Sequence, residues 1–464
     1  MIKKLSIVFI VTIFLVALSI HNVSKKQKDT KDLLIGAKQE VEYSEDIQKI
    51  KPIINKQLPS RSKLASLRKG PNKDNIQFID IEGKGEIKAA VPYEVETDKN
   101  PLRVLFLSKI SGNWKEDDEI KSVGQKFDKI VYKDLTGDGK LEVIVGLKVG
   151  ENSNKGISIY KLKNKKFEEI FRDYYTDFIV TDLDGDKMDE LVLIKMDKVT
   201  NGSSAELYKW KDNKLKHING VSLESSFEPY SIQVGNATDK QMGIFIDNGV
   251  GAHSGITELL VMKDGKLKNV FYDEKINGND KTTKPYLEKS RDKDKDGIIE
   301  IPLMRAPIDK KDESMIDTPW ITTWCKWDGE ESLIPISESY YNYNIELGFD
   351  FPTYWDDSIT IDTSKFYEEN RKENWIKFSY IDKDSGNKQE LFSIKVYDKK
   401  VWDEDKKYIE NEYALLGKSD SKVYTVEMND AIQGKKAKDI SMKFSMKLSE
   451  IKERFKIVKP YNKK

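Results

Sequence analysis

Residues 182–193 read DLDGDKMDELVL, a run in which aspartates alternate with other residues and an apolar segment follows. The same pattern recurs as DIEGKGEIKAAV at 80–91, DLTGDGKLEVIV at 134–145 and DKDKDGIIEIPL at 292–303. A shorter copy, NATDKQMGIFI, begins at Asn236. The copies start 48 to 56 residues apart, which is the spacing of a repeat architecture.

A second pattern, a strand followed by a polar turn and another strand, recurs in phase with the first. Its turn residues are Asn113, Asn164, Asn213, Gly265 and Gly329. Asn-Lys, Asp-Asn and Asp-Gly pairs at these turns favour tight hairpins, because such residues tolerate positive φ. A period near fifty residues that holds several strands is typical of a β-propeller blade, a small sheet that buries its faces against its neighbours. We therefore predict a mainly β chain with a propeller of about five blades over 76–336; a larger ring completed by a cryptic blade is the alternative.

The N-terminus has the pattern of a targeting segment. Lys3 and Lys4 precede an uncharged apolar run from 5 to 20, which is long for a signal peptide and short for a membrane span. We predict that residues 1–23 are a signal peptide or a membrane anchor, and both alternatives stay open. Either one places the rest of the chain outside the cytoplasm, secreted or anchored to the membrane.

Two further segments flank the repeats. Residues 24–75 are rich in Lys, Gln and Asp and predict a polar spacer, with one helix possible at 44–57. Residues 340–464 lack the repeat and predict a small α+β domain. Its expected elements include a strand at 422–428 and an amphipathic helix at 441–458.

Composition excludes several classes of protein. The 464 residues contain 79 Lys plus Arg and 79 Asp plus Glu, so the formal net charge is zero and a strongly basic nucleic-acid binder is excluded. Cys325 is the one cysteine, so the chain forms no internal disulfide. Three histidines and one cysteine argue against a zinc site of the usual ligands.

The repeated loops place oxygen donors at positions one, three, five and nine, with a backbone carbonyl at position seven. Calcium prefers six to eight hard oxygen ligands in flexible geometry, so such loops suit it better than magnesium. The candidate ligands are Asp134, Thr136, Asp138, the Lys140 carbonyl and Glu142; Asp182, Asp184, Asp186, the Met188 carbonyl and Glu190; and Asp292, Asp294, Asp296, the Ile298 carbonyl and Glu300. A helical EF-hand is excluded because position twelve is Val145, Leu193 or Leu303 instead of glutamate.

These loops resemble the Asp-x-Asp-Gly-Asp-Gly repeats of FG-GAP/VCBS proteins, which are also present in integrin α-subunit propellers. The resemblance covers residues 76–336 and implies that each loop joins two strands of a blade, with calcium at two or three of them. In the first copy Lys84 and Lys88 replace two ligands, so we expect that loop to be metal-free. The alternative reading is that Asp- and Gly-rich segments simply make good hairpin turns.

Other candidates for chemistry are few. His253 lies beside Ser254 in a glycine-rich segment, but the sequence supplies no third partner for catalysis. Trp320, Trp324 and Trp327 lie on one predicted hairpin and could stack on sugar rings or, as the simpler reading, fill blade interfaces.

We therefore expect a non-catalytic binding protein that recognises an extracellular protein or a cell-wall polymer. An extracellular hydrolase acting on glycans or peptides, with carboxylates in the propeller centre, is the alternative. A third possibility gives recognition to the C-terminal domain.

Overall fold

The computed structural model describes residues 44–67, 69–96, 98–150, 155–197, 202–224, 229–251, 254–364, 373–429 and 441–459. The predicted signal or anchor segment at 1–23 lies outside these residues. Among the residues that are described, no helix is long and apolar enough to cross a membrane. The chain divides into two compact units. The first extends to Thr176 and includes Lys209–Lys216, and the second comprises Asp177–Tyr208 and everything from His217 onward.

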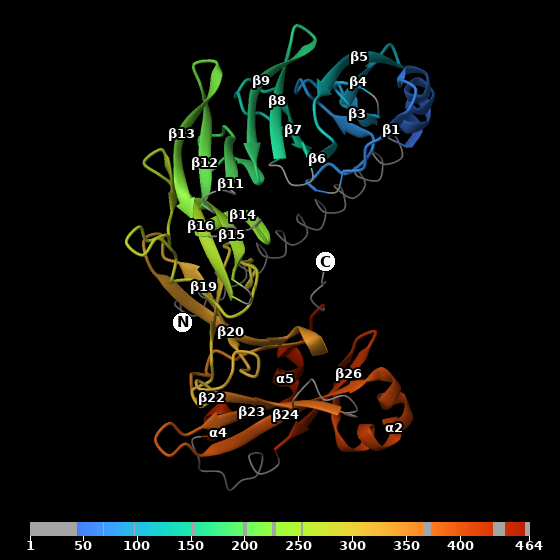
Figure 1. Cartoon of the computed structure of the whole chain (residues 1–464). Helices are drawn as coiled ribbons and strands as arrows, with labels where there is room; N and C mark the ends of the chain where they lie inside the picture. Colours follow the sequence, from blue (N-terminus) through green and yellow to red (C-terminus); the bar gives the residue numbers. More distant parts are fainter. Residues whose placement is uncertain are drawn as a thin grey trace, which may run out of the picture. The chain divides into compact units, whose positions relative to one another are not determined.

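The first unit contains two antiparallel sheets that share one apolar core (Figure 1). The strands of the first sheet are β1 (Ser62–Leu64), β2 (Gln77–Ile79), β3 (Lys88–Val95), β4 (Leu102–Ile110) and β5 (Asn113–Ser122). The strands of the second are β6 (Lys126–Lys133), β7 (Glu142–Lys148), β8 (Lys155–Lys163) and β9 (Lys166–Tyr175). Phe106 and Val145 are fully buried in the shared core, as the apolar side of a half-buried strand requires.

Residues 44–57 are helical, as the sequence predicted. The helix buries Ile50 and Ile54 against Val91 and Leu105 of the first sheet. Part of the predicted polar spacer is therefore packed structure, because the isoleucines of this helix supply an apolar side that the sheet covers.

The second unit begins with two four-stranded sheets in which each strand pairs with the next along the chain. Their strands are β10 (Asp177–Thr181), β11 (Glu190–Asp197), β12 (Gly202–Lys211) and β13 (Lys214–Leu223), then β14 (Ser231–Thr238), β15 (Gln241–Val250), β16 (Ser254–Lys263) and β17 (Lys266–Asn269). Val192, Leu207, Ile244 and Leu260 belong to one core that both sheets share. The repeat seen in the sequence is thus a repeat of small antiparallel sheets.

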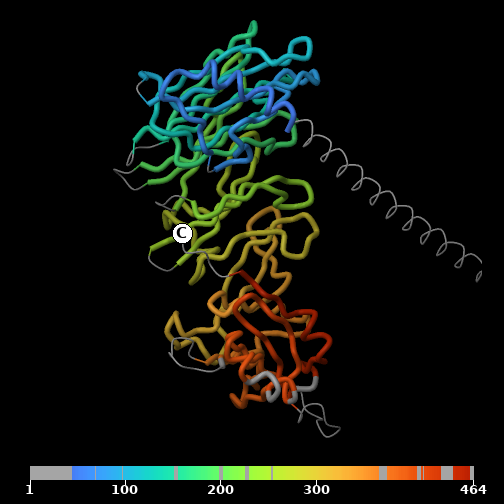
Figure 2. The backbone as a smooth tube through the Cα atoms, turned by 90° about the vertical axis from the view of Figure 1, so that its right-hand side faces the viewer, coloured from blue at the N-terminus to red at the C-terminus, as the bar shows by residue number. Residues whose placement is uncertain are grey.

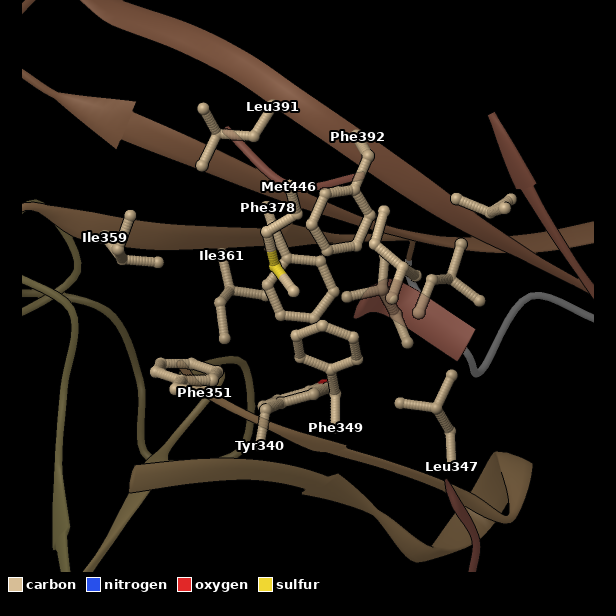
Figure 3. Packing of buried hydrophobic residues seen from close by; sticks show 14 of the residues in the cluster. Tyr340, Leu347, Phe349, Phe351, Ile359, Ile361, Phe378, Leu391, Phe392 and Met446 are labelled. Atoms are coloured by element: carbon tan, nitrogen blue, oxygen red, sulfur yellow. The ribbon is translucent and has the colours of Figure 1, made fainter. Parts of the chain in front are cut away.

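Two further sheets complete the second unit, and Figure 2 shows the chain passing from yellow to orange and red through them. One contains β18 (Ile301–Arg305), β19 (Ile321–Trp327), β20 (Leu333–Asn342), β21 (Leu347–Asp350) and β27 (Phe455–Ile457). The other contains β22 (Ile359–Thr363), β23 (Glu373–Ile381), β24 (Lys388–Asp398), β25 (Ala414–Lys418) and β26 (Lys422–Met428). An aromatic core lies between them, with Phe349 of β21 facing Phe378 and Phe392 at centroid distances of 4.9 and 5.4 Å (Figure 3).

The C-terminal residues differ from the prediction of one long helix at 441–458. They form α4 (Ser441–Phe444), α5 (Leu448–Arg454) and strand β27. The interruption has a local cause: Glu450 accepts the backbone N–H of Lys447 at 2.8 Å and starts a new helix there. The strand predicted at 422–428 is confirmed as β26. Helix α2 (Lys399–Glu412) was not predicted; it covers β24 and β26 and buries Trp402 (Figure 1).

The mainly β fold is confirmed, and it consists of several small antiparallel sheets. Four of the acidic segments lie where the repeat predicts. The loops of Asp134 and Asp182 lie between the first two strands of their sheets, the loop of Asp80 lies between β2 and β3, and the loop of Asp292 lies directly before β18. The last repeated sheet also takes β21 and the C-terminal strand β27, from the range predicted as a separate domain. Closure into a five-bladed ring and the predicted domain limits stay predictions.

Candidate functional site

The four acidic loops share one backbone conformation. In each of them the fourth and sixth residues have φ between 66° and 93°. These residues are Gly83 and Gly85, Gly137 and Gly139, Gly185 and Lys187, and Lys295 and Gly297. The first aspartate of each loop accepts the backbone N–H of the sixth residue, at 2.6 to 3.0 Å. The aspartate therefore holds the turn itself, whatever else it binds.

The ninth position of three loops holds a fully buried glutamate: Glu142, Glu190 or Glu300. Each of them accepts the backbone N–H of the second loop residue, at 2.9, 2.8 and 2.6 Å respectively. Burial raises the pKa of Glu142 to about 7 and raises that of Glu300 as well. A buried carboxylate of this kind requires a cation or a proton beside it.

Two of the loops bring three carboxylates together. Oxygen atoms of Asp182, Asp184 and Glu190 lie within 4.8 Å of one another, and those of Asp292, Asp294 and Glu300 do the same. These two triads could hold a metal ion.

The aspartates expected as ligands at the fifth loop position make hydrogen bonds within their own loops. Asp138, Asp186 and Asp296 each accept the backbone N–H of the seventh residue, which is Lys140, Met188 or Ile298, at 3.1, 2.8 and 2.9 Å. Among the described residues neither triad includes a fifth-position aspartate.

The loop that begins at Asp134 has a lysine among its oxygens. The ammonium nitrogen of Lys161, on strand β8, lies 2.6 Å from Thr136 Oγ1 and 3.0 Å from Asp138 Oδ2. The same nitrogen lies 3.7 Å from Glu142 Oε1. Three of the oxygen donors predicted for calcium therefore surround an ammonium group.

The loop that begins at Asp292 repeats this arrangement. The ammonium nitrogen of Lys326, on strand β19, lies 2.9 Å from Asp294 Oδ2, 2.5 Å from Asp296 Oδ2 and 3.5 Å from Glu300 Oε1. Burial alone would lower the pKa of Lys326, but the hydrogen bonds to Asp296 and Asp294 outweigh it and raise the pKa above its usual range. Lys326 is therefore protonated in this loop.

The first loop contains lysines in place of two ligands, as noted from the sequence. Lys84 donates to Glu82 at 3.1 Å, and its side chain is mostly exposed. Lys88 is buried and donates to Ser108 Oγ at 2.8 Å and to Asp117. Among the described residues the carboxylates of this loop form no group that could hold a metal, and its being metal-free stays a prediction.

A separate cavity of about 990 Å³ lies in the second unit, between the sheet of β18–β20 and strands β22 and β23. Six aromatic side chains contribute to its lining: Tyr286, Trp320, Tyr340, Tyr341, Tyr343 and Trp375. Tyr286 and the Trp320 indole both donate to the Met315 carbonyl at 2.9 Å, which fixes the loop 306–320 against the cavity wall. Tyr341 and Tyr343 stack with their centroids 6.0 Å apart.

Ion pairs surround these aromatic rings. Lys310 lies 2.9 Å from Glu313 and 2.8 Å from Asp362, so it joins the loop to strand β22. Glu288 is buried and accepts from Arg291 at 3.0 Å and from the Tyr343 hydroxyl at 2.5 Å. The cavity thus combines aromatic side chains with a fixed polar network, which is the composition of a binding pocket.

The structure separates the three tryptophans predicted on one hairpin. Trp324 and Trp327 are buried and fill the sheet interior, whereas Trp320 lines the cavity. His253 lies outside the described residues. The sequence did not reveal the cavity, because its lining comes from six separate segments between Tyr286 and Lys377 with no common pattern.

No protein-family model matches the chain, and no curated protein matches it. Solved structures do show similarity. Rhamnogalacturonan lyase YesW is 12% identical with a TM-score of 0.30, over 68% of this chain and 66% of that one. The exotype rhamnogalacturonan lyase YesX is 10% identical (TM-score 0.28; 72% of this chain and 84% of that one). The β-propeller domain of the Trilobed protease from Pyrococcus furiosus is 10% identical (TM-score 0.27; 69% and 96%). At these values the similarities carry no argument about function.

Proposed function

We propose that the chain is an exported, non-catalytic binding protein that holds a glycan segment of a cell-wall or extracellular polymer in the aromatic cavity. The FG-GAP/VCBS relationship and closure of the repeated sheets into a propeller of about five blades belong to this proposal. The proposed function rests on the cavity. A volume of about 990 Å³ accommodates a few sugar rings, and the aromatic side chains offer faces on which the C–H surfaces of sugars pack.

The acidic loops serve this function as rigid corners that hold adjacent strands in register. Calcium at the triads of Asp182 and Asp292 would neutralise the negative charge of these loops, and lysine ammonium groups would do the same. Ligand binding in the cavity depends on neither.

The alternative is a glycan-cleaving enzyme, and one observation favours it: Glu288, Glu313, Asp317 and Asp362 line the same cavity. Glycoside hydrolysis needs one carboxyl group as proton donor and a second as base or nucleophile. Glu288 is bonded to Arg291, and both Glu313 and Asp362 are bonded to Lys310. These pairings favour binding over catalysis.

The test is retention of the purified chain on washed bacterial cell walls and in affinity gels containing soluble polysaccharides. We expect retention to fall at least tenfold in the Trp320→Ala and Trp375→Ala variants. Tyr174→Ala removes an exposed aromatic ring elsewhere and is the matched control. Equal retention of all variants would refute the cavity as the binding site, and release of new reducing ends from a polysaccharide would support the enzyme instead.

A further inference from the structure

One cross-strand position in each repeated sheet decides which cation its loop can hold. The ninth loop residue begins the strand after the loop or lies beside that strand's first residue. In the first sheet it is Lys88, which pairs with Ser108 of the next strand. In the three sheets whose loops carry a glutamate, the adjacent pairs are Val143–Tyr160, Leu191–Tyr208 and Ile301–Cys325. One step along each ladder brings together the positions of Glu142 and Lys161, Glu190 and Lys209, and Glu300 and Lys326.

The residue types at these paired positions vary together. Each of the three glutamates has a lysine at the position across the ladder. In the first sheet the roles are exchanged, since the lysine is Lys88 and its partner is Ser108. A lysine therefore accompanies each acidic ninth position.

We propose that the ammonium groups of Lys161 and Lys326 are the resident cations of their loops, so that these corners need no calcium. Each nitrogen lies within 3.0 Å of two loop oxygens that calcium would have to coordinate. An ammonium group donates three hydrogen bonds and is satisfied by the oxygens present, whereas calcium requires six to eight. A second positive charge at this distance would also repel the lysine.

This inference differs from the calcium expected from the sequence at two of the three loops. That expectation rested on the donors within each loop, whereas the lysines lie 19 to 32 residues beyond the oxygens that they contact. The inference is independent of glycan binding, since neither loop lines the aromatic cavity.

The first experiment measures calcium binding to the purified full-length chain by equilibrium dialysis and calorimetry, after removal of metals with EDTA. We expect no calcium bound at the loops of Asp134 and Asp292. The Asp184→Asn variant removes a calcium ligand from the third loop and serves as the background. If this variant still binds calcium, and a further Asp294→Asn or Asp138→Asn change removes that binding, the proposal is overturned.

The second experiment removes the lysine. Lys326→Met should lower the melting temperature of the second unit in EDTA, and added calcium should restore it, because the emptied carboxylates then recruit the metal. Lys295→Met, which removes an exposed charge from the same loop, should show neither effect. Lys161→Met repeats the measurement in the first unit should the other variant not fold. A Lys326→Met chain as stable as the wild type, with no response to calcium, would overturn the assignment.

Discussion

The indole N–H of Trp355 donates to the backbone carbonyl of Phe444 across 2.9 Å and joins residues 89 positions apart. Trp355 is buried and packs on Phe351 with ring centroids 5.0 Å apart. Phe444 stacks on Tyr380 of β23 at 5.0 Å. Helix α4 is therefore joined to the segment between β21 and β22 by a buried hydrogen bond within an aromatic core.

This contact predicts the effect of Trp355→Phe. The variant keeps an aromatic ring in the core but leaves the Phe444 carbonyl buried without a donor, so the free energy of unfolding should fall by about 1–3 kcal/mol. Tyr354→Phe is the control, because its hydroxyl makes a long contact of 3.4 Å at the surface, and it should change stability by less than about 0.5 kcal/mol. Urea unfolding, followed by the circular dichroism of the backbone and not by tryptophan fluorescence, measures the stability of both variants. Equal effects of the two variants would show that the indole N–H contributes nothing.

The sharing of strands between the last repeated sheet and the C-terminal residues predicts that residues 340–464 do not fold alone. In such a fragment β20 keeps only Tyr340–Asn342 and loses its own neighbour β19, and the core loses Ile321. We expect a chain without a cooperative thermal transition, whereas a fragment that begins at Asp177 should melt cooperatively. Circular dichroism of the two fragments is the measurement, and a sharp transition in the short fragment would contradict the shared core.

A buried ion pair supports the fourth sheet. Lys284 and Asp247 are both fully buried, with Nζ and Oδ1 3.6 Å apart. Thr257 and Ser290 donate to the same carboxylate at 2.7 and 2.9 Å. Because removal of one partner leaves an uncompensated charge, Lys284→Met should cost about 3–5 kcal/mol of unfolding free energy.

The matched variant for this pair is the double change Lys284→Met with Asp247→Asn. The double variant has no unpaired buried charge, so it should recover part of the unfolding free energy that Lys284→Met loses. The coupling energy of the pair follows from a double-mutant cycle of the wild type, the two single variants and the double variant. Additive losses in the two single variants would mean that the pair does not interact.

The repeated sheets were predictable because each acidic loop and hairpin is encoded within about fifteen consecutive residues. The turn at Asp182 needs only Asp182, Gly185 and Lys187, and a short apolar run that directly follows such a turn is typical of a buried strand. Helix 44–57 followed from its isoleucine spacing in the same way.

The features that local patterns do not encode were missed. Strand β27 pairs with β21 more than one hundred residues earlier, so no local signal distinguishes it from the end of a helix. The lysine beside each glutamate loop is visible in the sequence only after the strand register is known, since Lys326 lies 26 residues beyond Glu300. The cavity joins six separate segments and has no sequence pattern of its own.

Glu258 of β16 predicts how stability depends on pH. Its side chain accepts the backbone N–H of Glu224 at 2.8 Å and the amide groups of Asn248 and Asn269 at 2.9 and 3.1 Å. Burial nevertheless raises its pKa to about 7 from an ordinary value of 4.5, and the nearby Glu224 carboxylate acts in the same direction. The amide oxygens of Asn248 and Asn269 have no hydrogen-bond partner among the described residues. If the side-chain amide of either asparagine rotates by half a turn, its oxygen can accept a hydrogen bond from the protonated Glu258 carboxyl group.

The sign follows from the two protonation states. Between pH 4.5 and 7 the folded chain keeps a proton on Glu258 that the unfolded chain releases, so this group stabilises the fold fully below pH 4.5 and loses its contribution as the pH rises to 7. Glu258→Gln holds an uncharged side chain at every pH and should remove this component. We therefore expect the free energy of unfolding of the variant, relative to the wild type, to increase between pH 4.5 and 7 and to level off above. Urea unfolding at half-unit pH steps measures the difference, and a constant difference across this range would show that Glu258 titrates at its ordinary pKa.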